Sequence, residues 1–195
     1  MSKLLCLVFF FSLFYSCSLI KLRHDLGDKL ISNGDFSRNA GSWKYQEVEV
    51  NEGTIYNKSW TTGPIAELDV NNNQKLSQNW TYLQEGMKCT ISLQYAAREN
   101  APSLQTCSFK VNWNGETVEE IVPKDHNINN YSHEVTTIAG INTLELEGSG
   151  PSDGYGATVD NVSLKCIPVP LHYEEGKEYL RNGSFDIPDQ SGLKA

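Results

Sequence analysis

Apolar and polar residues alternate with a period of two over several short stretches of the chain. In Cys89–Arg98, the apolar side chains of Ile91, Leu93, Tyr95 and Ala97 alternate with polar or small ones. The same alternation recurs in three further segments: Ser108–Asn114, Thr143–Glu147 and Thr158–Leu164. Apolar positions at helical spacing are almost absent, and turn residues separate the alternating segments. The pattern predicts roughly six to nine short strands in an antiparallel β-sandwich with little helix.

The first residues carry the layout of an export signal. Lys3 precedes an almost unbroken apolar run over Leu4–Phe14, and small polar residues follow it. That run is too short to serve as a stable membrane anchor, and no later stretch is apolar enough to cross a bilayer. We therefore expect a signal peptide over residues 1–20 and a secreted or cell-surface protein with no transmembrane segment. The alternative is a lipid anchor on Cys17, because Phe14–Cys17 loosely resembles a bacterial lipoprotein cleavage box.

A short phrase occurs twice in the chain. Asn33-Gly34-Asp35-Phe36 reappears 149 residues later, as Asn182-Gly183-Ser184-Phe185. A period of that length corresponds to a whole domain and not to a solenoid repeat. We expect one module over residues 30–166, a linker over 167–178 that is rich in proline and acid, and the start of a truncated second copy over 179–195. The alternative is chance similarity between two short strings.

The charge balance argues against one class of partner. The sequence has 16 basic and 24 acidic residues, and the expected leader contains one lysine and no acid. The mature chain is therefore more acidic still, and no stripe of basic residues is present. Nucleic acid is not an expected partner.

Recognisable catalytic phrases are missing. The four histidines are scattered without metal-ligand spacing, at His24, His126, His133 and His172. No serine lies in a nucleophile elbow, and no carboxylate pair stands in a catalytic phrase. The cysteines lack the close paired spacing of zinc sites. We expect a binding protein that is not an enzyme.

Six phrases follow one another in the order of a known fold. They are Asn33–Phe36 with Trp43, Ala66–Asp69, Cys89–Arg98, Val111–Gly115, Asn142–Leu146 and Asp153–Leu164. This series resembles the galactose-binding-like jelly rolls. Within them it is most similar to the family called domain of unknown function 642, found in plant cell walls and in bacterial secreted proteins. The resemblance implies an extracellular, non-catalytic jelly roll that binds polysaccharide or wall proteins.

The resemblance also implies a calcium ion. Related jelly rolls often hold a structural ion where the first strand meets the last, and the fold would bring Asp35 of the opening phrase to Asp160 of the closing one. A hard cation requires about six to eight oxygens, so loop carbonyls would have to complete the set. In the alternative, Asp35 caps a turn and Asp160 accepts bonds from neighbouring backbone amides.

Jelly-roll topology suggests how the three cysteines outside the leader are used. An exported protein meets oxidising conditions, so one disulfide and one spare thiol are expected. The last strand of such folds commonly lies beside the strand that begins at Cys89. We therefore expect a Cys89–Cys166 disulfide and a free Cys107.

Sugar binding needs aromatic faces for the pyranose ring and polar groups for its hydroxyls. Trp113 and Tyr95 share strand faces with apolar residues and are expected in the core, whereas other aromatic and polar residues are free to bind. The candidate ligand contacts are Trp60, Gln94, Arg98, Lys110, Asn112 and Tyr155. The alternatives are an ordinary solvated sheet face, a structural or adhesion module that binds extracellular matrix or surface proteins, and an accessory domain of a longer enzyme.

Five asparagines begin an N-glycosylation sequon. We expect Asn57, Asn79 and Asn130 to be available for modification, and Asn161 to be protected by its predicted strand. The fifth, Asn182, lies in the truncated repeat.

Overall fold

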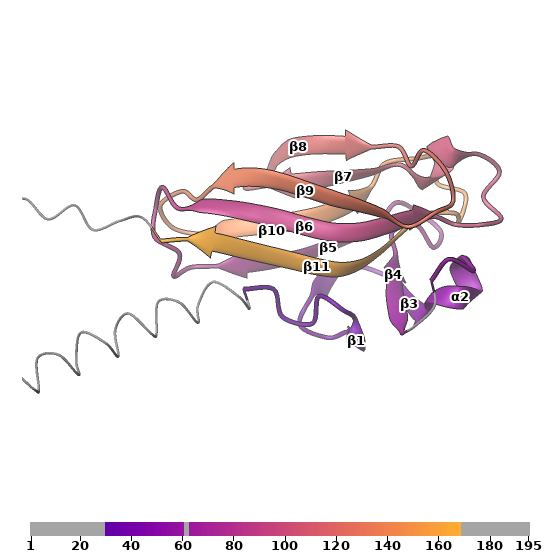
Figure 1. Ribbon diagram of the computed structural model, residues 1–195, viewed down its shortest axis with the longest axis horizontal. Helices are drawn as coiled ribbons and strands as arrows, with labels where there is room; N and C mark the ends of the chain where they lie inside the picture. Colours follow the sequence, from indigo (N-terminus) through magenta and orange to yellow (C-terminus); the bar gives the residue numbers. More distant parts are fainter. Residues whose placement is uncertain (1–29, 61–62, 169–195) are drawn as a thin grey trace, which may run out of the picture.

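The computed structural model describes residues 30–60 and 63–168, which form two five-stranded antiparallel sheets packed face to face (Figure 1). The elements in order are β1 (Ser37–Ala40), β2 (Lys44–Tyr45), β3 (Glu49–Glu52), α2 (Gly53–Tyr56), β4 (Pro64–Glu67), β5 (Lys75–Trp80), β6 (Lys88–Ala97), η1 (Leu104–Cys107), β7 (Phe109–Trp113), β8 (Glu116–Ile121), β9 (Asn129–Thr136), β10 (Asn142–Gly148) and β11 (Ala157–Ile167). The expected signal peptide, most of the linker and the truncated second copy lie outside these residues.

Each sheet is named here after its central strand. The β10 sheet has the order β2-β5-β10-β7-β8, and the β11 sheet has the order β3-β4-β11-β6-β9. Several neighbours in the sheets are far apart in sequence, as the pairing of β11 with both β4 and β6 illustrates. The predicted antiparallel jelly-roll sandwich is confirmed. The described residues form eleven strands instead of six to nine, because short edge strands such as β2 escape a period-two pattern.

The core lies between the sheets and follows the alternation in the sequence. Ile91 and Leu93 of β6 are buried, while the intervening side chains point outward. Trp113 stacks on Trp80 with ring centroids 6.2 Å apart, and its indole N–H donates to a backbone carbonyl. The expectation that Trp113 belongs to the core is therefore confirmed. Burial of such side chains stabilises each by about 1.5–3 kcal/mol relative to exposure.

The segment 30–43 packs against β11 where that strand bulges. A register shift between Asp160 and Ser163 frees the amide of Val162, which donates to the carbonyl of Gly34 at 2.9 Å. A Cβ at Gly34 would lie 2.0 Å from the Val162 carbonyl oxygen, so only glycine permits this approach. The bulge thus brings the opening phrase of the module to the closing one.

Two ends of the sandwich are distinguished below. At the Arg98 end, β6 finishes and β11 begins, and Ala97 pairs with Ala157. At the Cys89 end, β6 begins and β11 finishes. There Cys89 and Cys166 are directly paired and joined by a disulfide, which is the pair that the topology suggested. Cys107 is free and buried, and burial raises the pKa of its thiol to about 11.

Candidate functional site

The six predicted ligand contacts do not form one site. Gln94 of β6 lies on the outer face of the β11 sheet, whereas Lys110 and Asn112 of β7 lie on the outer face of the β10 sheet. The other three, Trp60, Arg98 and Tyr155, gather at the Arg98 end. The six candidates are therefore not a single binding surface, because alternation shows which residues of a strand face outward but not to which sheet the strand belongs.

A cavity of about 290 Å³ lies on the outer face of the β10 sheet, toward the Cys89 end. It is lined by Asn112, Asn114, Gly115, Ile138, Ile141, Thr143 and Glu145. The walls include Ile138 and Ile141, which are 48% and 56% exposed. Of the six predicted ligand contacts, only Asn112 lines this cavity.

Hydrogen bonds hold the polar floor of this cavity in place. Asn112 donates through Nδ2 to Glu145 at 3.1 Å and to Glu147 at 3.2 Å, and its Oδ1 accepts from Thr117. Lys75 bridges the same two carboxylates at 3.1 Å each. Burial acts to lower the pKa of Lys75, but its hydrogen bonds to the carboxylates outweigh that and raise the pKa. The floor therefore presents fixed carboxylate and amide groups with lone pairs still free to accept hydrogen bonds.

A second hollow of about 390 Å³ adjoins the cavity. It lies between the edge strands β8 and β9, and it shares Asn114 and Ile138 with the first. Its lining mixes apolar side chains such as Val118 and Val135 with polar ones such as His133. The two hollows together extend the surface open to a ligand from the β10 sheet around the edge of the sandwich.

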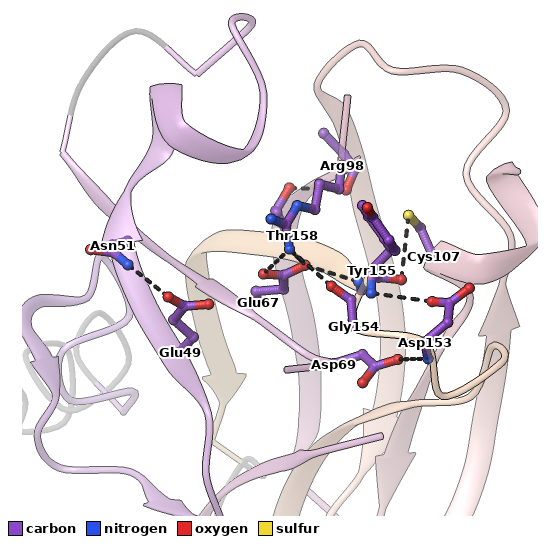
Figure 2. A network of polar contacts seen from close by, with 12 residues as sticks. Glu49, Asn51, Glu67, Asp69, Arg98, Cys107, Asp153, Gly154, Tyr155 and Thr158 are labelled. Atoms are coloured by element: carbon purple, nitrogen blue, oxygen red, sulfur yellow. Dashed lines mark hydrogen bonds and ion pairs between the residues drawn. The ribbon is translucent and has the colours of Figure 1, made fainter. Parts of the chain in front are cut away.

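At the Arg98 end, a guanidinium binds a buried carboxylate (Figure 2). The same guanidinium lies over the rings of two tyrosines. The Arg98 guanidinium carbon is 5.4 Å from the centroid of the Tyr56 ring and 5.0 Å from that of Tyr155. Nη1 donates to the Glu67 carboxylate at 3.0 and 3.1 Å and to the carbonyl of Gly154 at 2.9 Å. These contacts tie together β4, the end of β6 and the loop before β11.

Glu67 is fully buried, with a relative exposure of 0%. Burial raises the pKa of its carboxyl to about 7, although the amide of Gly156 and the guanidinium of Arg98 both act to lower it. A carboxylate in this position fastens the loop before β11 onto β4. Arg98 thus joins Glu67 and Gly154 by hydrogen bonds and lies over the rings of Tyr56 and Tyr155, which is the geometry of a structural clamp.

Trp60 is also a structural residue. It is 2% exposed, packs with Tyr56, Ile65 and Ala96, and donates from its indole N–H to Thr158 at 2.9 Å. The prediction that Trp60 forms the rim of a ligand site was therefore wrong. The segment around α2 folds back over the outer face of the β11 sheet and covers this end of it.

The structure places the predicted calcium ligands near enough for the charge of Asp35 to act on Asp160. Burial is the main cause that raises the pKa of Asp160 to about 6. The backbone amide of Asn161 acts to lower this pKa, and the negative charge of Asp35 acts to raise it. Asp160 is 7% exposed, and its Oδ1 has no hydrogen-bond partner. Asp35 accepts bonds from the amide and hydroxyl of Ser37, which hold its pKa below the usual value. Within residues 30–60 and 63–168 there is no group of three or more His, Cys, Asp or Glu that could hold a metal. Other oxygens would have to complete any cation site here.

The sequon asparagines differ in accessibility. Asn57 is 2% exposed, and its Nδ2 donates to the carbonyls of Ala97 and His126. The prediction that Asn57 is available for glycosylation was therefore wrong, because the amide nitrogen that would carry the glycan is enclosed. Asn79 and Asn130 are exposed. Asn161 is exposed too, with a positive φ of 51° in the β11 bulge, so its strand does not bury it as expected.

Among the residues described, no helix is long and apolar enough to cross a membrane.

Part of the chain is similar in sequence to curated proteins. No protein-family model matches the chain, so the resemblance to domain of unknown function 642 stays a prediction. The chain is 33% identical over 140 residues to a multifunctional-autoprocessing repeats-in-toxin protein of Vibrio vulnificus, covering 70% of this chain and 3% of the toxin. For the toxin of the same name from Vibrio cholerae, the identity is 30% over 137 residues, covering 68% of this chain and 3% of the toxin. The chain therefore spans only a small part of the relatives that it matches.

Solved structures show similar arrangements at low identity. A family 35 carbohydrate binding module from Clostridium thermocellum has 13% identity and a TM-score of 0.46, with 64% of this chain and 92% of that chain covered. TmCBM61 in complex with β-1,4-galactotriose has 14% identity and a TM-score of 0.48, covering 69% and 95%. Tailspike protein 4 of bacteriophage CBA120 has 15% identity and a TM-score of 0.49, covering 70% and 21%. All three TM-scores lie below one half.

Proposed function

We propose that this chain is a secreted or cell-surface, non-catalytic module that binds a glycan in the cavity on the outer face of the β10 sheet. The observation that carries the proposal is the cavity itself. Its polar floor is fixed by hydrogen bonds, and two exposed isoleucines stand beside it. Lys110, opposite Glu147 on the same face, extends the polar surface.

The floor suits a ligand rich in hydroxyl groups. The Glu145 side chain is 29% exposed, so it is reachable while Asn112 and Lys75 hold it in position. A carboxylate accepts hydrogen bonds from vicinal hydroxyls. The Asn114 side chain donates to Asn142 and accepts from the amide of Thr143, which leaves one N–H and one lone pair for a ligand. Because these groups are already ordered, little side-chain entropy is lost when a ligand binds.

The walls suit the apolar face of a sugar ring. Ile138 and Ile141 are large apolar side chains left open to solvent, and contact with a ligand would remove that surface from water. Aliphatic walls lack the flat face on which a pyranose stacks, so we expect weak binding by a single sugar and tighter binding by an oligosaccharide that also reaches the hollow between β8 and β9.

A glycan array on the mature chain, followed by calorimetry with the glycan found, tests this proposal. Ile141→Ser and Glu145→Gln should each weaken binding. The matched control is Gln94→Ala, which removes an outward polar side chain from the β11 sheet and should leave binding unchanged. Loss of binding in the control alone would contradict the proposal. Asn79, a possible glycosylation site, pairs directly with Thr143 of the cavity lining, so a glycan attached to Asn79 would lie near the cavity. Binding should therefore also be measured with the Asn79→Gln variant, which cannot carry that glycan.

A structural calcium ion is the second part of the proposal. The buried, unpartnered Oδ1 of Asp160 fits such an ion, and Asp35, whose charge acts on Asp160, would supply a second carboxylate. Backbone carbonyls and water would complete the six to eight oxygens that calcium requires. The ion would stabilise the contact between the segment 30–43 and β11. It lies away from the β10 sheet, so glycan binding should survive its removal.

An adhesion module remains the second candidate. Ile138 and Ile141, which form the apolar walls of the cavity, could equally meet an apolar patch on a matrix or surface protein. A competition experiment distinguishes the two functions. A soluble oligosaccharide should displace a bound glycan but should not displace a protein partner that is held by an apolar patch.

A further inference from the structure

Two loops at the Arg98 end contain a concentration of buried oxygens that lack partners. Among the residues described, six buried side-chain oxygens have no hydrogen-bond partner. Three of the six belong to the loops that precede β5 and follow β10, namely Asp69 Oδ1, Asn73 Oδ1 and Ser149 Oγ. Buried polar atoms are normally satisfied, so three exceptions in one pair of loops require a common explanation.

The backbone places the first two of these side chains together. Asp69 and Asn73 form an antiparallel β-bridge. Residues directly opposite in such a pair have Cβ atoms about 4.5–5.5 Å apart and project to the same face. Asn73 donates from Nδ2 to the carbonyl of Gly150 and from its backbone N–H to Ser152, which fixes the direction of its Oδ1.

Glycines in the second loop let the first approach closely. A Cβ at Gly148 would lie 2.8 Å from Asn73 Oδ1, and a Cβ at Gly156 would lie 3.0 Å from the Cβ of Asp69. Ser149, whose hydroxyl also lacks a partner, directly follows Gly148 in the chain. A side chain at Gly148 would occupy the space beside Asn73 Oδ1.

Among the three residues with unpartnered oxygens, Asp69 is the one that can carry a negative charge. It is 1% exposed, and Oδ2 accepts a hydrogen bond from the amide of Asp153 at 3.2 Å while Oδ1 accepts none (Figure 2). An ionised carboxylate is costly to bury unless its oxygens are compensated. The Arg98 guanidinium does not compensate this charge, because its hydrogen bonds go to Glu67 and Gly154.

We propose that these two loops hold a divalent cation of the hard, oxygen-binding class, best matched by calcium, with Asp69, Asn73 and Ser149 as side-chain ligands. The donor set contains one carboxylate, one amide oxygen and one hydroxyl and no nitrogen or sulfur donor, which favours calcium over zinc. Backbone carbonyls and water complete the coordination. A site with a single carboxylate is expected to bind weakly, in the range of extracellular calcium modules, about 10⁻⁴–10⁻³ M.

This site is separate from the one proposed at Asp35 and Asp160. It would fasten the loop before β11, the same loop that supplies Gly154 and Tyr155 to the Arg98 clamp. The competing explanation is buried water, which satisfies such oxygens in many proteins without any ion.

Calorimetric titration of the chelator-treated mature chain with calcium distinguishes the two explanations. The Asp160→Asn variant removes the other candidate ion, and one calcium should still bind. Adding Asp69→Asn should abolish that binding, and adding Ser149→Ala should weaken it several-fold. The matched control is Asp125→Asn, because Asp125 is an exposed aspartate at the same end whose Oδ1 already has partners. Binding that persists after Asp69→Asn, or no binding in Asp160→Asn, overturns the proposal in favour of water.

A second measurement needs no substitution at the site. Hydrogen–deuterium exchange of Asp160→Asn should show that calcium slows the backbone amides of residues 69–74 and 148–156 and leaves those of the Cys89 end unchanged. Equal exchange with and without calcium in those two loops would refute the site, even if the double variant failed to fold.

Discussion

Removal of the Arg98 side chain should be among the most destabilising single changes at the Arg98 end. Arg98→Ala leaves the fully buried Glu67 carboxylate without its cation and removes the group that lies over the rings of Tyr56 and Tyr155. Breaking a buried ion pair from one side costs roughly 3–5 kcal/mol. Because the Arg98 side chain is 27% exposed, we expect the lower end of that range, about 3 kcal/mol in the free energy of unfolding.

The cost should depend on pH in a defined direction. Burial raises the pKa of Glu67 from 4.5 to about 7 in the wild type, and loss of the guanidinium should raise it further. In the folded variant Glu67 therefore keeps its proton at pH values at which the unfolded chain, with the ordinary pKa of 4.5, has already released it. The free energy of unfolding falls as the pH rises from 4.5 to the raised pKa of the folded state. The penalty of Arg98→Ala should thus be smaller at mildly acidic pH than at pH above neutral.

Urea unfolding of wild type and variant across that pH range measures the effect. The matched control is Lys58→Ala, which removes the exposed partner of Glu99 one residue further along and should cost little at any pH. A penalty for Arg98→Ala as small as that of the control, or one that does not change with pH, would refute the clamp.

Three further outcomes are expected. Replacing Cys89 and Cys166 by serine should lower the unfolding free energy by about 4 kcal/mol in denaturant titrations, because the bridge closes a loop with a sequence separation of 77; a loss near zero would contradict it. Gly34→Ala should lower the melting temperature strongly, since its Cβ would lie 2.0 Å from the Val162 carbonyl oxygen; an unchanged melting curve would contradict the close contact. Chelation should remove the stabilisation by calcium, about 2.7 kcal/mol at a hundredfold excess over the dissociation constant, and Asp160→Ala should reduce that response; a wild-type curve unmoved by chelator would show that no structural ion is held.

The core strands could be predicted because a two-residue period reports burial on one face. Cys89–Arg98 was expected as a strand, and β6 spans Lys88–Ala97. The assignment of strands to sheets could not be predicted, because hydrogen bonding between strands distant in sequence decides it. Gln94 and Asn112 were both predicted as ligand contacts from the alternation of their strands. They lie on the outer faces of different sheets, on opposite sides of the sandwich.

Covered sheet faces were the other source of error. In Ala66–Asp69 two acids alternate with apolar residues, which is typical of a strand with one solvated face. The structure buries Glu67 and Asp69, since the α2 segment and the loop before β11 cover that region. Trp60 was misplaced for the same reason. The segment around α2 contains two large aromatic residues, Tyr56 and Trp60, and this was the feature of the sequence that indicated that the segment folds back onto the protein.

The central claim is that ligand binds on the outer face of the β10 sheet. Amide chemical-shift mapping by nuclear magnetic resonance, during titration of the isotope-labelled mature chain with a glycan selected on an array, tests it most directly. We expect the perturbed amides to cluster in residues 112–115 and 138–145, which contain all of the residues that line the cavity. Perturbations confined to the Arg98 end or to the outer face of the β11 sheet would contradict the account.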